Sequence, residues 1–371
     1  MDVSDITARA HQVLWAAFFV SLLFGAIAQR THFCTMGAIS DVVNIGDWTR
    51  MRQWGLAVGV AMIGFALLAW AGWIDPGKSL YASTRWMWLS ALTGGALFGF
   101  GMVLASGCGS KTLVRIGSGN LKSLVVFVVM GIAAFATLKG ITAVLRVSTV
   151  DRIALEMPGG TSLTAITSSL AGWNPALAGL ALAVVIGGAL IVWAFAGQDF
   201  FNADNLLAGL GIGAVVVAMW WISGRLGYVV EHPETLQEVF LTTNSGRMEA
   251  LTFTAPMAYT LDWLILFSDK SKVLTIAIVS VAGVIVGAAI QALAGRSFRW
   301  EGFRDVEDLS NHLVGAMLMG IGGVTAMGCT VGQGLSGVST LSITSFVAVA
   351  GIIGGAVLAF RYQNWRLERM A

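Results

Sequence analysis

The chain has 371 residues, of which 56% are hydrophobic and only 11% are charged, and its formal net charge is +2. Soluble globular proteins carry about 25% charged residues, so this chain has too few to cover a surface that faces water. The small net charge gives no indication of nucleic-acid binding. The composition therefore predicts an integral membrane protein.

Spanning helices need about 20 mostly apolar residues each. Nine such segments follow one another along the chain: 12–29, 54–73, 88–105, 121–145, 175–196, 205–223, 273–294, 311–326 and 341–360. We expect the first to be a mature helix rather than a signal peptide, because it runs directly into a cysteine motif. A further apolar segment, 255–267, is too short to cross and contains Asp262, which favours a re-entrant or half-spanning helix.

Two long polar segments lie between these helices. Segment 146–173 has a Pro-Gly-Gly turn and is expected to pack over one face of the helices, with a short half-helix. Segment 224–254 is acidic and is predicted to be external. Positive residues in short loops favour the cytoplasm, and two groups of arginines predict a periplasmic amino terminus and a cytoplasmic carboxy terminus: Arg50, Arg52, Arg361, Arg366 and Arg369.

Three cysteines, Cys34, Cys108 and Cys329, are the only ones in the chain, and each lies in a glycine-rich break beside an apolar segment. Irregular backbone at membrane depth is tolerated only where it is buried in protein or lines a cavity. The glycines that flank these cysteines fit a turn with positive φ and a backbone exposed to a ligand: Gly107, Gly109, Gly328, Gly332, Gly334 and Gly337. We therefore expect the three thiols to share a cavity.

An internal repeat relates two of the cysteine motifs. Residues 92–108 resemble residues 313–329 at a constant offset of 221, with Cys108 matching Cys329. A fainter match lays Arg30 on Arg296 and Cys34 on Arg299. Internal repeats around glycine-interrupted helices point to a transporter site between two halves. The sequence thus predicts one transport domain, 1–371, whose repeat-like halves span approximately 12–145 and 273–360 and are joined by 146–272.

Three thiols can serve only a few kinds of functional site. They could bind copper(I) or zinc as soft ligands, but the sequence has no Cys-x-x-Cys pair, no nucleotide fingerprint and no hydrolase pattern. A thiol is a weak donor and a weak acceptor, which suits a soft, sulfur-bearing anion that must bind and then leave. Lys111 either adds positive potential to such a path or snorkels to the interface. We expect a permeation path without enzyme activity, metal or cofactor.

The cysteine motifs resemble those of the YeeE/YedE family of sulfur-compound permeases. The matching segments are Phe33-Cys-Thr-Met-Gly-Ala38 with Asp41, Ser106-Gly-Cys-Gly109 and Met327-Gly-Cys-Thr-Val-Gly-Gln-Gly-Leu-Ser-Gly337. The similarity covers nearly the whole hydrophobic chain. It implies an all-α, pseudo-symmetric, hourglass-shaped bundle of about nine spanning helices with half-helices and central cysteine loops, which imports thiosulfate across the bacterial inner membrane.

The resemblance also implies that Cys34, Cys108 and Cys329 line the substrate path. We expect six residues beside them to line it as well: Gly107, Gly109, Gly328, Thr330, Gln333 and Lys111. The thiols would relay thiosulfate by S–H···S hydrogen bonds, and a small sulfur carrier of the TusA type would be the cytoplasmic partner. A selenium substrate, a role as a membrane sensor of sulfur oxidation and persulfidation of a cysteine stay open. Lys139 and Asp262 are candidate proton sites.

Overall fold

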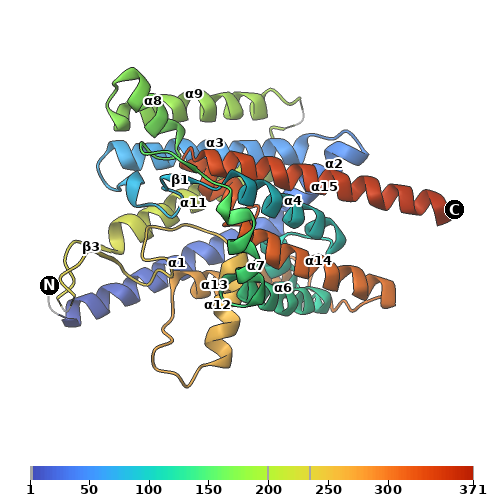
Figure 1. Ribbon diagram of the computed structural model, residues 1–371. Coiled ribbons are helices and arrows are strands. Elements are labelled where there is room, and N and C mark those ends of the chain that lie inside the picture. Colours follow the sequence, from blue (N-terminus) through green and yellow to red (C-terminus); the bar gives the residue numbers. More distant parts are fainter. Residues whose placement is uncertain (1–2, 199, 234, 371) are drawn as a thin grey trace.

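The computed structural model describes residues 3–198, 200–233 and 235–370, and it is built almost entirely of helices (Figure 1). Eight helical segments of this part are long and apolar enough to cross a membrane: Ser4–Asn44, Thr49–Trp70, Trp88–Gly117, Leu121–Lys139, Pro175–Phe195, Ala203–Leu226, Ile276–Ala294 and Ile343–Arg369. The prediction of an all-α, multi-pass membrane protein is confirmed.

Fifteen α-helices follow one another in the described residues. They are α1 (Val3–Thr31), α2 (Thr35–Asn44), α3 (Thr49–Trp70), α4 (Trp88–Leu104), α5 (Gly109–Gly117), α6 (Leu121–Lys139), α7 (Ile141–Ser148), α8 (Leu163–Ala171), α9 (Pro175–Phe195), α10 (Ala203–Leu206), α11 (Ile212–Trp221), α12 (Thr254–Ile265), α13 (Ile276–Ala294), α14 (Val306–Thr325) and α15 (Ile343–Met370).

Short elements of other kinds complete the described chain. The 3₁₀ turns are η1 (Pro76–Lys78) and η2 (Val150–Arg152), and the π-helical turns are η3 (Leu207–Gly211), η4 (Ile222–Leu226) and η5 (Gly332–Gly337). Two antiparallel pairs of two-residue strands join β1 (Arg85–Trp86) to β2 (Leu155–Glu156) and β3 (Tyr228–Val229) to β4 (Val239–Phe240).

Two predicted segments differ from the helices observed, and a third agrees with its prediction. Segment 311–326 forms α14, a helix of 20 residues with an acidic first turn that is not among the eight spans. Segment 121–145 is not one helix, because the extended backbone of Gly140 separates α6 from α7. Segment 255–267 forms the 12-residue half-helix α12 as expected, and its Asp262 accepts a hydrogen bond of 2.5 Å from Lys272 Nζ.

The repeat helices α4 and α14 cross each other through glycine. A Cβ on Gly315 would lie 2.6 Å from the carbonyl oxygen of Gly101, and a Cβ on Gly101 would lie 2.6 Å from that of Gly315. Gly94 and Gly322 form the same reciprocal contact, at 2.7 and 2.6 Å. The paired positions run in opposite directions along the two helices, so α4 and α14 are antiparallel. Small residues allow this close approach of two backbones.

The contacts around this crossing repeat as well. Helix α15 packs on α4, where Gly99 faces the backbone of Ile352, and α6 packs on α14, where Gly320 faces the backbone of Met130. Helix α6 follows α4 in the chain, and α15 follows α14. The offset of the internal repeat therefore relates the pair α4–α15 to the pair α14–α6. The pseudo-symmetry of the sequence is therefore also a pseudo-symmetry of packing.

The remaining long helices surround this centre. Helix α1 packs against α13, and the two end in matching turns, with φ of 53° at His32 and 52° at Arg296. His32 is thus the structural counterpart of Arg296, two residues from the sequence alignment. Helices α8 and α9 lie at the edge of the bundle beyond α3, and α15 ends at the opposite end of the molecule from the start of α1 (Figure 1).

The α4–α14 crossing should be intolerant of even one methyl group. We expect Gly315→Ala to lower the stability of the protein by about 1–3 kcal/mol, because the backbone of Gly101 cannot move without shifting both repeats. Gly354→Ala in α15 is the matched control, since a Cβ there meets nothing within 4 Å. Melting temperatures of the two variants in detergent test this prediction. Equal melting temperatures for Gly315→Ala and Gly354→Ala would contradict the close contact between α4 and α14.

Candidate functional site

Cys34 begins one of three short helices at the centre of the bundle. It is the N-cap of α2, with extended backbone (φ −161°, ψ 121°). Its sulfur accepts a hydrogen bond from the Gly37 N–H at 3.4 Å, and its carbonyl oxygen accepts one from the Ala38 N–H at 2.9 Å. The thiol thus takes the place of the serine or aspartate oxygen that usually caps a helix.

Cys108 has the same position at the start of α5. Its backbone is extended (φ −81°, ψ 177°), and its carbonyl oxygen accepts a hydrogen bond from the Thr112 N–H at 2.9 Å. The Ser110 hydroxyl lies 3.3 Å from the sulfur, which, unlike that of Cys34, accepts no capping backbone N–H within the described residues. A polar group of the first helical turn therefore lies beside this thiol.

Cys329 repeats the arrangement before η5. The Gly332 N–H donates to its sulfur at 3.4 Å, and the Gln333 N–H donates to its carbonyl oxygen at 2.7 Å. All three cysteines are free and buried, with exposed fractions of 7% for Cys34 and 0% for Cys108 and Cys329. Each thiol therefore lies at the positive end of a short helix, where backbone N–H groups favour an anion.

The three thiols form a series with Cys108 in the middle. Cys34 and Cys108 lie close enough for their side chains to interact, and Cys329 interacts electrostatically with Cys108. Thr330 points toward Cys108, although its hydroxyl makes no hydrogen bond of good geometry within the described residues. Residues more than 200 positions apart in the chain thus meet at one point.

The turns before two of these cysteines differ from our expectation. Positive φ falls on Ser106 (55°) and Met327 (58°) and not on the flanking glycines. The Gly107 N–H donates to the Met102 carbonyl oxygen and the Gly328 N–H to that of Gly323, as in a Schellman motif whose left-handed residue precedes the glycine. Space at Gly328 is tight, since a Cβ there would lie 3.1 Å from the Gln333 side chain.

Two other predicted residues have clear local contacts. Gln333 is buried and donates from Nε2 to the Ala326 carbonyl oxygen at 2.5 Å, so it ties η5 to the end of α14. A Cβ on Gly109 would meet Met130 and Phe253 side chains at ordinary contact distances of 3.4 and 3.5 Å. Gln333 and Gly109 therefore both contribute to the packing around the thiols.

Basic groups gather beside Cys34. The Arg50 guanidinium lies over Gly37, and its Nε is 2.8 Å from Asp41 Oδ2. Lys111 is half-buried and near enough to Cys34 and Cys108 to interact electrostatically with both, and it also faces the exposed His32. This end of the thiol series therefore carries positive potential.

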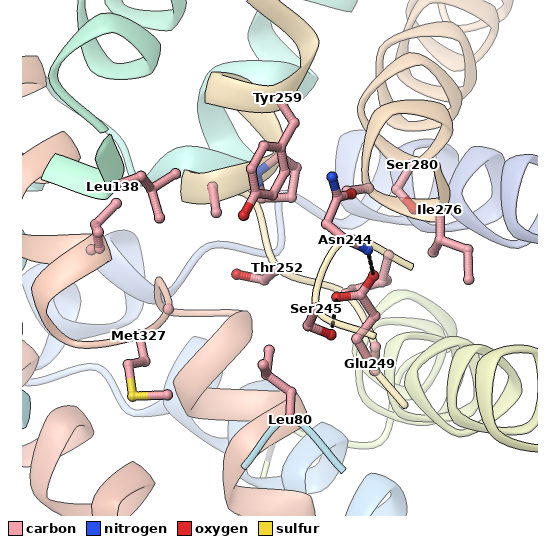
Figure 2. A pocket seen from close by; sticks show the side chains of 18 of the residues that line it. Leu80, Leu138, Asn244, Ser245, Glu249, Thr252, Tyr259, Ile276, Ser280 and Met327 are labelled. Atoms are coloured by element: carbon pink, nitrogen blue, oxygen red, sulfur yellow. Dashed lines mark hydrogen bonds between the residues drawn. The ribbon is translucent and has the colours of Figure 1, made fainter. Parts of the chain in front are cut away.

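A cavity of about 190 Å³ adjoins the other end of the series (Figure 2). Gly328 and Thr252 line its inner part, and the Thr252 hydroxyl is 3.9 Å from the sulfur of Cys329. Asn244 and Ser245, both exposed, line it toward the surface, while Glu249 is buried. The cavity leads from a surface loop toward the last thiol.

The segment predicted to be external supplies this cavity. It begins near the amino-terminal end of α1, where Val229 and Leu241 pack against Ile6, but its last residues return into the bundle, and Leu251 and Phe253 are almost fully buried. The last residues of 224–254 are therefore packed inside the bundle, while the external side of this segment stays a prediction. The run Ala250-Leu-Thr-Phe253 was the only apolar signal for this insertion.

Two hydrogen bonds join η5 to its surroundings, one to Leu251 of the inserted segment and one to Tyr81 in the loop before α4. The Ser336 hydroxyl donates to the Leu251 carbonyl oxygen at 2.7 Å, and the Tyr81 hydroxyl donates to the Gly332 carbonyl oxygen at 2.6 Å. Within the described part of the chain, no group of three or more His, Cys, Asp or Glu side chains is placed to hold a metal ion. The geometry offers thiols and N–H donors to an anion.

Known proteins resemble this chain over nearly its whole length. The chain is 27% identical over 360 residues to "Thiosulfate transporter TsuA" of Spirochaeta thermophila, covering 94% of this chain and 98% of that protein. It is 26% identical over 362 residues to the protein of the same name from Escherichia coli K12, covering 94% of each. A shorter match, 28% identity over 116 residues, covers 31% of the chain and 27% of "Probable transporter YedE" from the same organism.

The family model described as "Sulphur transport" matches residues 30–358, a range that contains all three cysteine-capped helices. The resemblance to YeeE/YedE permeases is confirmed by this match and by the named relatives, which are transporters and not enzymes. The chain therefore belongs to the sulphur transport family of multi-pass membrane transporters.

Proposed function

We propose that this protein imports thiosulfate, or a closely similar sulfur oxyanion, across the bacterial inner membrane along the series Cys329, Cys108 and Cys34. The observation that carries the proposal is the convergence of three buried, free thiols, each at the N-terminus of a short helix. The relatives named as thiosulfate transporters, which match 94% of the chain, support the choice of substrate.

The capping geometry suits a weak relay. The sulfurs of Cys34 and Cys329 each accept a backbone N–H, and a thiol can also donate its S–H to the terminal sulfur of the anion. The aligned N–H groups of the helix add attraction without a fixed counter-charge. Since thiols are weak donors, the anion can pass to the next thiol without being trapped, as conduction requires.

The two ends of the path suggest its direction. We place the cavity on the periplasmic side, together with the amino terminus, and the basic end around Arg50 and Lys111 toward the cytoplasm. The end of α15 carries Arg361, Arg366 and Arg369. It lies at one end of the molecule, and the start of α1 lies at the opposite end (Figure 1). This arrangement agrees with the preference of positive residues for the cytoplasm.

A small sulfur-carrier protein of the TusA type is the partner that we propose at the cytoplasmic end. The basic side chains Arg50 and Lys111 beside Cys34 support a site where an anion is handed to an acceptor. Binding of a purified carrier to liposomes that contain the protein, compared with protein-free liposomes, tests this partner. Equal binding to both would contradict it.

Removal of the middle thiol should interrupt the path. We expect Cys108→Ala to reduce uptake of labelled thiosulfate into liposomes at least tenfold, which corresponds to about 1.4 kcal/mol in the barrier. Cys108→Ser, which keeps an O–H donor, should retain more activity than the alanine variant. Unchanged uptake in Cys108→Ala would contradict the relay, and a wild-type protein that accumulates no label would favour a sensor.

The burial of the thiols makes a separate prediction about their reactivity. In the detergent-purified native protein, we expect a maleimide to modify Cys108 and Cys329 slowly, because neither exposes any surface, and to modify all three cysteines after denaturation. Intact-mass measurement counts the adducts. Rapid triple modification of the native protein would contradict the closed centre, and added sulfur after exposure to thiosulfate would indicate a persulfide intermediate instead.

A further inference from the structure

The cavity next to Cys329 contains a buried carboxyl group, that of Glu249, which is only 7% exposed. Its Oε1 accepts a hydrogen bond of 3.1 Å from the Asn244 N–H, and its Oε2 lies 3.2 Å from the Ser245 hydroxyl, which donates to it. Figure 2 shows both contacts, with Tyr259 and Thr252 among the other side chains around the same cavity.

Among the described residues, no lysine or arginine forms an ion pair with this carboxyl group. The titratable groups that face it are the phenols of Tyr81 and Tyr259. Arg146 also lines the cavity, but its Nε lies 3.0 Å from Asp151 Oδ2, so its charge is already paired. Helices α13 and α14 contribute no titratable side chain to the cavity.

An ionised Glu249 would oppose the proposed transport. An anion that crosses the cavity to reach Thr252 and Cys329 would meet a carboxylate in a region of low dielectric, where like charges repel strongly. Burial already disfavours the carboxylate, and it raises the pKa of Glu249, which lies between the spanning segments, to about 7. The group therefore exchanges its proton close to neutral pH.

We propose that Glu249 is a substrate-binding residue that acts as the neutral acid, donating its O–H to an oxygen of the sulfur oxyanion in the cavity before the anion reaches Cys329. This inference rests on the proposed function and adds the group that recognises the oxygen-bearing end of the substrate. The acid predominates below about pH 7 and the carboxylate above it. Uptake is therefore fast at low pH on the cavity side and falls as that pH rises.

The test uses the full-length protein in liposomes, with the same pH on both sides so that no gradient drives uptake. For the wild type, we expect the initial rate with subsaturating labelled thiosulfate to fall about tenfold between about pH 6 and pH 8, the change in the protonated fraction of one such group. Glu249→Gln keeps an N–H donor without a charge, so its rate should be independent of pH.

Two further variants separate charge from hydrogen bonding. Glu249→Ala should also lose the pH dependence, but its KM should be several times that of Glu249→Gln, because it lacks a donor. Ser245→Ala removes a hydrogen bond that stabilises the carboxylate, so its pH profile should shift to higher pH. Glu231→Gln, an exposed glutamate of the same segment, is the matched control and should behave as the wild type.

The outcomes distinguish this inference from the proposed function. A wild-type pH profile in Glu249→Gln overturns the role of Glu249, while the proposed transport stands if the wild type takes up label and Cys108→Ala still reduces that uptake at least tenfold. If the Glu249 variants do not fold, Ser245→Ala decides, and an unshifted profile in that variant overturns the inference. A wild-type protein without uptake at any pH overturns both.

Discussion

The close approach of α4 and α14 is the contact on which the centre of this protein depends. Because glycines allow two antiparallel backbones to touch, the turns that end these helices are held in a fixed relation, and each turn leads at once into a cysteine-capped helix. Backbone-to-backbone contact cannot adjust by a change of rotamer, unlike contact between long side chains. The same geometry in both repeats places Cys108 and Cys329 near each other.

Cysteine capping gives these helices a chemistry that serine capping would not. The backbone N–H groups that meet a sulfur atom stabilise the turn, and they also make the surroundings of the thiol favourable to negative charge. Cys34 lies outside the matched segments 92–108 and 313–329, yet as the N-cap of α2 it lies beside Cys108, the N-cap of α5. Cysteines at the starts of three short helices therefore meet in one candidate path, and the sulfurs of Cys34 and Cys329 accept a capping backbone N–H.

The two ends of this path differ in charge. Arg50 and Lys111 surround the thiol series at one end, and the cavity at the other end contains Glu249 without an ion-pair partner among the described residues. Burying a carboxyl group costs much more free energy when it is ionised than when it is neutral. Protonation of Glu249 therefore decides whether the cavity carries a negative charge.

Much of this organisation could be predicted from the sequence, because membrane spans depend on long apolar runs and the repeat depends on identical residues at a constant offset. The cysteines could be singled out by their glycine-rich breaks, and α12 by its length. Tertiary structure alone decided that Cys108 lies between the other two thiols, that positive φ falls on Ser106 and Met327, and that the loop ending in Phe253 turns inward. These features depend on packing between residues far apart in the chain, which no local pattern records.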